Sequence, residues 1–285
     1  MSMVSTSSED VLVQDAEELE RMRLKRIKKI AKWFLPTLVM IATVAAWHYY
    51  VVLWEVPHYI LPGPGRVAAS ILDDRAILWP AMLGTGQLTL LALALAIVGG
   101  GLLAILFTQS EWAEMSFFPY AIILQVTPVV AIAPLLQIYL ENGFVAALLC
   151  AWLVAFFPIL SNTIIGLKST DHNLEDLFTI YEATVWQRLA MLKLPTALPF
   201  FLGGLKIASG LALIGAVVAE FVIGRAGTGV GLASTLLEAS YRFNFPRLYA
   251  SLILISAMGI VLFAITATIS HLALRNWHES ALKRE

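Results

Sequence analysis

The sequence predicts an all-α polytopic membrane protein with six transmembrane helices, and three observations lead to that prediction. Hydrophobic residues make up 59% of the 285 residues and charged residues only 14%, and the mean hydropathy is +0.79. Six apolar stretches are long enough to cross a hydrocarbon core, which takes roughly 20 helical residues. A charged segment with helical periodicity separates the fourth stretch from the fifth. The six stretches are Trp33–Leu53, Leu88–Phe107, Phe117–Leu140, Phe144–Ile165, Phe200–Ile223 and Leu248–Leu272.

The first stretch is too long and begins too far along the chain to be a signal peptide. Six spans place both termini on one side, and most Lys and Arg residues fall on that side, so we expect both termini in the cytoplasm. The opposite side receives Arg66, Arg75, Arg225, Arg242 and Arg247. The chain then divides into an N-terminal tail (1–32) with a mobile or loosely helical acidic start, a six-span domain (33–274) with a cytoplasmic loop (168–199), and a C-terminal tail (275–285).

Prolines and glycines interrupt the middle spans. Pro119, Pro128, Pro134 and Pro158 lie in or beside the third and fourth, and Gly99–Gly101 lies in the second. Small residues in membrane helices permit close contact and bending. We expect a tightly packed, bent bundle, and the lack of an internal duplication suggests that one chain supplies one half of an assembly.

The loop before the fifth span predicts an amphipathic helix. Its apolar residues recur every three or four positions, and Asp171 or Asn173 can serve as the N-cap, with Glu175 in the first turn. Pro195 and Pro199 are expected to break or bend this helix before the next span. Two interpretations stay open from these residues alone: a helix lying at the membrane surface, or a docking site for a cytoplasmic partner. The apolar stripe is Leu174, Leu177, Phe178, Tyr181, Val185, Leu189 and Leu192.

Several segments, in order, resemble the permease subunits of bacterial type I ATP-binding-cassette importers, in particular the nitrate, sulfonate and taurine branch. They are "YILPGPGRV" (59–67), "QVTPVVAIAPLLQIYLENG" (125–143), "LIGAVVAEFVIG" (213–224) and "LEASYRFNFPRLYASL" (237–252). With "RNWHES" near the end, they lean toward importers of pyrimidine precursors or riboflavin-like compounds. The resemblance covers nearly all of the chain after residue 30.

The family's cytoplasmic loop starts with Glu-Ala-Ala, has a glycine four residues after the last alanine and ends in Ile-x-Leu-Pro. Counting back from Leu194 and Pro195 puts Asp176 at the Glu position and Glu182 at the Gly position. The acidic residue of the motif is thus kept as Asp176. The glycine, which forms a flexible connection between two short helices in the family, is replaced by Glu182.

The resemblance implies that this loop docks on a separate ATPase subunit. Asp176 would face a basic residue of the partner, Ala183 and Thr184 would lie near its backbone, and Trp186 would bury a large apolar area. Packing of Trp186 on its own spans and headgroup contact by Arg188 are the alternatives. The full docking set is Asp176, Tyr181, Glu182, Ala183, Thr184, Trp186, Gln187 and Arg188.

Polar residues inside spans are the other candidates, because lipid makes them costly. Gln125 and Ser209 are the candidates to line the translocation path, and structural hydrogen bonding between helices is the alternative for both. Glu220 is expected to be structural and to accept hydrogen bonds from the glycine-rich turn at 224–232, and Lys206 to extend toward the cytoplasmic headgroups.

The resemblance also implies the partners: ATPase subunits, a periplasmic substrate-binding protein, a second permease copy forming a homodimer, and lipid of the bacterial inner membrane. The solute would be nitrate-, sulfonate- or taurine-like, or a pyrimidine or riboflavin-type precursor. The sequence contains no GxxxxGK[ST] loop, so we expect no cofactor in this chain and ATP with Mg²⁺ on the ATPase.

Other classes fit less well. The sequence has no HExxH or GxSxG motif, its five histidines are scattered and Cys150 is its single cysteine, so neither an intramembrane enzyme nor a metal site is expected. The net charge of −1 gives no field for nucleic acid. Glycines 227, 229 and 231 follow no strand and do not form a dinucleotide site. A stand-alone secondary transporter remains the alternative, although it predicts acids at mid-membrane.

Overall fold

The computed structural model describes residues 8–224 and 231–275, with the side chains of residues 28, 31, 32 and 34 onward. No strand occurs in these ranges. The chain divides into two compact units, Met1–Arg66 and Val67–Glu285, and each is described by itself. Gly227, Gly229 and most of the expected C-terminal tail lie outside the described residues.

The first unit is dominated by one helix, α1 (Ser8–Leu53), which runs for 46 residues. Its apolar part, Phe34–Leu53, is long enough to cross a membrane. The backbone of α1 is helical from Ser8, so the described part of the acidic start is helical and continuous with the span. Helix α2 (Pro64–Asp73) starts at the end of this unit, with Pro64 in the first turn, where its missing N–H costs nothing.

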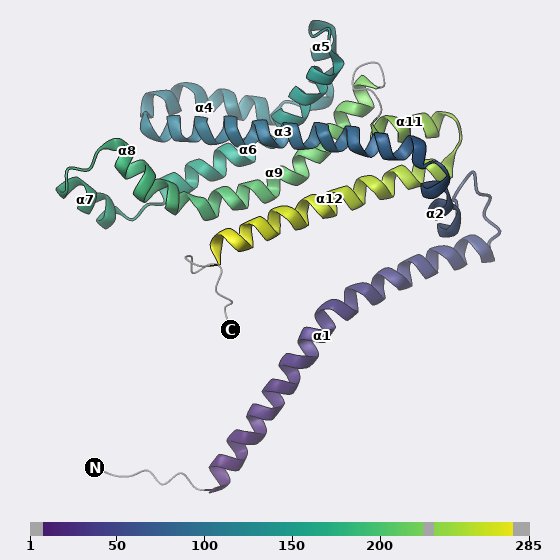
Figure 1. Ribbon diagram of the computed structural model, residues 1–285, viewed down its shortest axis with the longest axis horizontal. Coiled ribbons are helices and arrows are strands. Elements are labelled where there is room, and N and C mark those ends of the chain that lie inside the picture. The colour runs from purple at the N-terminus through teal and green to yellow at the C-terminus, as the bar shows by residue number, and fades with distance from the viewer. Residues whose placement is uncertain (1–7, 225–230, 276–285) are drawn as a thin grey trace. The chain divides into compact units, whose positions relative to one another are not determined.

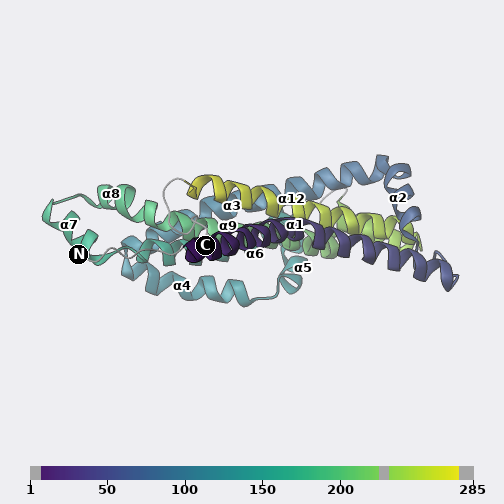
Figure 2. The same cartoon turned by 90° about the horizontal axis from the view of Figure 1, so that it is seen from below.

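Four long helices form the second unit: α3 (Arg75–Gln109), α6 (Gly143–Lys168), α9 (Leu194–Ile223) and α12 (Phe245–Leu274). They run lengthwise beside one another in Figures 1 and 2. Each contains one predicted span and extends it at one or both ends. Helix α11 (Leu232–Tyr241) lies at one end of this bundle, and α7 (His172–Ile180) with α8 (Val185–Arg188) at the other.

The predicted third span is broken in the middle. Helix α4 (Glu111–Val126) and helix α5 (Val129–Tyr139) meet at an angle of 101°. Pro128 lacks an N–H and disfavours helical geometry at the preceding residue, and Thr127 accordingly has an extended backbone (φ −72°, ψ 125°). Pro119, Pro134 and Pro158 stay inside helices. The described helices therefore give five candidate spans, or six when the bent pair counts as one.

Helices α6 and α9 make the most extensive helix contact of the described bundle, and their backbones approach closely. A methyl group added at Gly204 would meet the carbonyl oxygen of Pro158 at 2.7 Å, and one at Gly215 would meet the Cα of Ala151 at 2.9 Å. Alanines fill the space between these points, for example Ala155 and Ala212, both with no exposed surface. Small residues let the two backbones approach, which is how helices associate where lipid provides no hydrophobic driving force.

A buried carboxylate joins three helices at the α11 end. Glu220 of α9 accepts a hydrogen bond from the Thr85 hydroxyl of α3 (2.7 Å) and another from the Ala233 N–H in the first turn of α11 (2.9 Å). Thr85 in turn accepts from the Leu232 N–H (2.8 Å). The positive end of the α11 dipole therefore faces the carboxylate. Gly231 lies against that carboxylate, where no side chain would fit.

An ion pair ties the start of α3 to the start of α12 at the same end. Arg247 donates to Asp74, which also accepts from Ser70 (2.8 Å). The hydrogen bond from Arg247 lowers the pKa of the Asp74 carboxyl below its usual value. A carboxylate with a depressed folded-state pKa adds stability above its unfolded pKa of about 3.9, and that stability is lost as the pH falls through the folded value.

Asp74→Asn should lower the melting temperature of the purified protein at pH 7, because Arg247 keeps its charge and loses its ionic partner. The deficit should begin to shrink as the pH falls below about 4, where the unfolded chain takes up a proton at Asp74, and should disappear once the pH is below the lowered pKa of the folded wild-type carboxyl. Thermal unfolding in detergent at several pH values measures this. The adjacent exposed Asp73→Asn is the control, and an equal effect of the two changes at pH 7 would contradict the role of the pair.

Gly204→Ala should destabilise the bundle by about 1–3 kcal/mol, because its methyl group must displace the Pro158 backbone. The neighbouring Gly203→Ala is a matched control, since a methyl group there meets nothing within 4 Å and alanine favours helix. Thermal unfolding of both variants in the same detergent tests the contact. Equal melting temperatures would show that α6 and α9 are not in close contact.

Candidate functional site

The loop that joins α6 to α9 begins with a capped short helix. Asp171 is the N-cap of α7 and accepts from the Asn173 N–H (2.8 Å), so the first of the two expected caps is the one used. Glu175 lies in the first turn and Asp176 is exposed beside it. The acidic start of the helix complements the positive end of its dipole.

Helix α7 ends in a turn at Glu182, and the prediction of one continuous helix through Leu192 is wrong. Glu182 has a positive φ of 51°, in the left-handed region that glycine adopts most easily. The Ala183 N–H bonds back to the Phe178 carbonyl (2.9 Å) and closes the turn. The residue aligned with the family's glycine thus has a glycine-like conformation. That glycine position was itself the signal that the apolar stripe would be interrupted.

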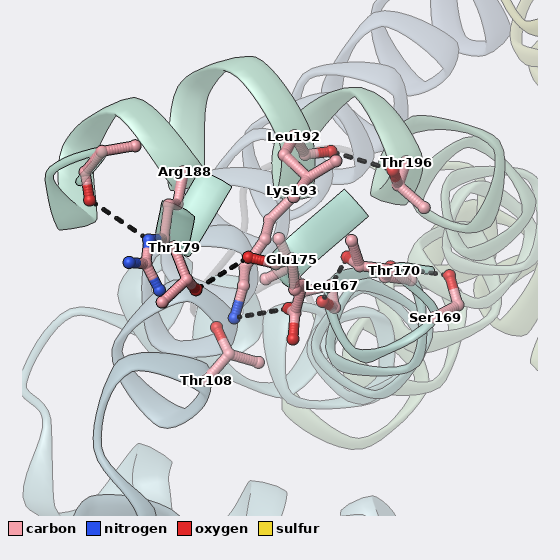
Figure 3. Close-up of polar contacts among 12 residues, drawn as sticks. Thr108, Leu167, Ser169, Thr170, Glu175, Thr179, Arg188, Leu192, Lys193 and Thr196 are labelled. Carbon is pink, nitrogen blue, oxygen red and sulfur yellow. Dashed lines mark hydrogen bonds and ion pairs between the residues drawn. The ribbon is translucent and has the colours of Figure 1, made fainter. Parts of the chain in front are cut away.

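A second short helix, α8, follows with reciprocal capping. The Gln187 N–H donates to the Thr184 hydroxyl (3.3 Å), and the Thr184 N–H donates to the Gln187 side chain (2.8 Å). Arg188 donates from Nε to the Ala183 carbonyl (3.2 Å), as Figure 3 shows. These bonds make Thr184, Gln187 and Arg188 parts of the local framework of the loop.

Large apolar side chains are exposed where the two short helices meet. Tyr181 is 78% exposed, Trp186 76% and Val185 61%. Ile180, which the sequence reasoning did not select, is 78% exposed. We call residues 180–186 the loop tip. Of the predicted stripe, only Leu189 and Leu192, next to α9, are buried, whereas Leu174, Leu177, Tyr181 and Val185 are exposed.

The loop is connected to α9 without a break, so neither Pro195 nor Pro199 ends the helix. The segment Val185–Ile223 is one helical run of 39 residues, with a π-helical turn, η1 (Leu189–Lys193), immediately before Pro195. There the Leu194 N–H bonds to the Leu189 carbonyl. The wider turn relieves the crowding that a proline ring causes in a regular helix.

Two ion pairs brace the loop end of the bundle. Glu175 of α7 lies 3.4 Å from Lys193 of η1, and Glu114 of α4 lies 2.6 Å from Lys168 of α6. Figure 3 shows the Glu175–Lys193 pair between the two arms of the loop. Sequence reasoning did not find either pair, because their members lie 18 and 54 residues apart and show no helical spacing.

The candidate residues for the translocation path lie in different settings. Gln125 is exposed near the end of α4. Ser209 has no exposed surface, and its hydroxyl bonds to the Lys206 carbonyl (2.9 Å) and meets Thr266 of α12 (3.3 Å). Ser209 therefore links α9 to α12 in this conformation. Among the described residues, no group of three or more His, Cys, Asp or Glu side chains could hold a metal.

The Glu182 conformation leads to a prediction about loop order. Glu182→Gly should leave amide hydrogen exchange in residues 180–188 unchanged or slower, because glycine adopts the left-handed region readily. Glu182→Val should speed that exchange by about tenfold, since a β-branched residue is strained there. Hydrogen exchange with mass spectrometry measures both, and peptides from α12 provide the internal control. Equal exchange in the two variants would contradict the positive φ.

Three comparisons with known proteins identify the family. Residues 96–277 match the model described as the binding-protein-dependent transport system inner membrane component. The chain is 33% identical over 230 residues to the formylaminopyrimidine transport permease protein ThiX of Halalkalibacterium halodurans, covering 80% of this chain and 90% of that protein. It is 32% identical over 248 residues to the riboflavin transport system permease protein RibX of Chloroflexus aurantiacus, covering 86% and 90%.

A solved structure, an amino acid ABC transporter with histidines, matches with a TM-score of 0.57 and 17% identity over 73% of this chain and 97% of that one. At that identity the match shows the fold. The family match spans more than half of the chain, and the apolar helices agree with it. The protein therefore belongs to the inner-membrane components of binding-protein-dependent transport systems, as a multi-pass permease subunit of an ATP-binding-cassette importer.

Proposed function

We propose that the loop tip and its flanks, Asp176 to Arg188, form the surface on which separate ATPase subunits dock and drive this permease. The observation that carries the proposal is the loop tip, where four large apolar side chains are exposed on a turn that the chain's own hydrogen bonds hold in shape. Exposed aromatic anchors on an ordered framework are typical of binding hot spots. Charged Asp176, Glu182 and Arg188 surround them and can set the orientation of the partner.

The continuity of the helix supports a coupling role. Residues of α8, η1 and α9 belong to one helical run, and Glu175–Lys193 ties α7 to it. A displacement of the loop tip by a docked partner would therefore move α9 and, through the close α6–α9 contact, the rest of the bundle. ATP and Mg²⁺ would act on the ATPase subunit, and this chain would supply no hydrolytic groups.

The assembly we propose has two copies of this chain around one path, with a substrate-binding protein on the outer side. The distribution of basic residues supports cytoplasmic termini, with the coupling loop on the same side. The solute belongs to the range of the relatives' names: formylaminopyrimidine or riboflavin among those above 30% identity, and nitrate or aliphatic sulfonates among more distant ones. A stand-alone secondary transporter is disfavoured, because Glu220 is occupied in linking three helices.

Reversing the loop charges should release the ATPase. We expect a variant with Asp176→Lys, Glu182→Lys and Arg188→Glu to co-purify with the ATPase encoded beside it about tenfold less than the wild type does. The reason is that repulsion between like charges would replace attraction at the interface. Single Asp176→Lys or Glu182→Lys changes should lower solute uptake at unchanged membrane levels. Quantitative immunoblotting of the purified complexes measures retention.

The control is Glu141→Lys, an exposed acid between α5 and α6 outside the loop. It should retain the ATPase as the wild type does. Equal retention by the triple variant would show that the ATPase is held elsewhere, and failure of the wild type to bind any ATPase would contradict the proposed assembly.

A further inference from the structure

Lys206 occupies an unusual depth in the bundle. It follows Lys193 by 13 residues and precedes Glu220 by 14 on one continuous helical run, so it lies roughly 20 Å along the helix axis from each. Lys193 is fixed at the loop end by Glu175, and Glu220 at the other end by α11. Lys206 therefore lies between the two tied ends of the bundle, six residues and roughly 9 Å inside the predicted span Phe200–Ile223.

The ammonium of Lys206 has no counter-ion within the described part of the chain. Lys206 is partly buried, and its side chain makes no hydrogen bond or ion pair there. The nearest acid along α9, Glu220, is already bound by Thr85 and Ala233. Acids elsewhere in the described second unit are paired with other cations or lie in loops and helix ends; the paired ones are Asp74, Glu114, Glu175 and Glu238.

The face of α9 around Lys206 is open. Gly203 and Gly210 lie three residues before and four residues after it, which places them on the same side of the helix. A methyl group added to either glycine would meet nothing within 4 Å. Ile207 and Ile214 continue this face and are 52% and 56% exposed. The other side of α9 packs on α6, so a molecule from outside this chain can approach the ammonium.

A lysine at this depth needs water or an anion, because an unpaired charge facing lipid is costly and intramembrane charges generally face a bundle interior or a water-filled cavity. We infer that Lys206 lines the solute path and binds an anionic oxygen group of the solute, such as a carboxylate, sulfonate or nitrate. This inference rests on the proposed function, in which two copies enclose the path. The ammonium offers three donors, and the flanking glycines leave room for an oxyanion to reach them.

The test measures how the positive charge of Lys206 changes the reactivity of a cysteine introduced beside it toward anionic and cationic reagents. The only native cysteine, Cys150, is buried and is replaced by alanine. Gly203→Cys then supplies a thiol three residues from Lys206, and the purified protein in lipid nanodiscs is treated with sulfonatoethyl methanethiosulfonate (anionic) or trimethylammonioethyl methanethiosulfonate (cationic). The ratio of the two modification rates should fall about threefold to tenfold when Lys206 becomes Met, because a unit charge some 8 Å away no longer attracts the sulfonate. Lys206→Arg should keep the ratio.

Ile214→Cys is the matched control, because it lies on the same face but roughly 12 Å along the axis from Lys206, beyond one Debye length at physiological salt. Its rate ratio should change less than about twofold. If neither reagent modifies the thiol of the Gly203→Cys variant, the face is covered by lipid or protein and the inference is overturned. It is also overturned if both reagents react and the ratio does not depend on Lys206. ATPase retention is measured on the same preparations, so a failure of the proposed assembly is recognised separately.

Discussion

The close contact between α6 and α9 is the constraint on which the rest of the bundle depends. Lipid tails are as apolar as leucine, so two membrane helices gain little from burying large apolar side chains against each other. Here the contact relies on backbone proximity at Gly204 and Gly215, with alanines between them. Helix α3 packs on the same pair, with Gly100 against Ile159 of α6. The position of α9 therefore decides where the loop, α11 and α12 lie.

Polar contacts are concentrated at the two ends of this packed unit. At one end Glu220 and Thr85 hold the first turn of α11, and Asp74 holds Arg247. At the other end Glu114–Lys168 and Glu175–Lys193 connect the loop arms to the helices. Both ends are thus tied by groups that satisfy each other, whereas Lys206 between them has no such partner in the described part of the chain. This contrast separates side chains that stabilise the fold from one that is available to a ligand.

The loop combines a stiff connection with an exposed apolar surface. The Thr184–Gln187 capping pair and the Arg188–Ala183 bond fix the turn, and the π-helical turn carries the helix past Pro195. An interface residue that is already ordered loses less entropy on binding than a mobile one. In the proposed docking, Trp186 and Tyr181 would therefore bind with little reorganisation of the loop.

The sequence by itself determined the class of protein and the approximate spans, because hydropathy over some 20 residues and the order of characteristic segments can be read along the chain. It also named Pro128 among four prolines that interrupt the third and fourth spans, and Glu182 as the residue in the glycine position. Only the tertiary structure decided that the third span turns by 101°, that the apolar stripe splits at Glu182, and that the helix continues through Pro195. It alone paired Glu220 with Thr85 and Glu175 with Lys193, since contacts between distant residues depend on how the helices pack and leave no periodic signal in the chain.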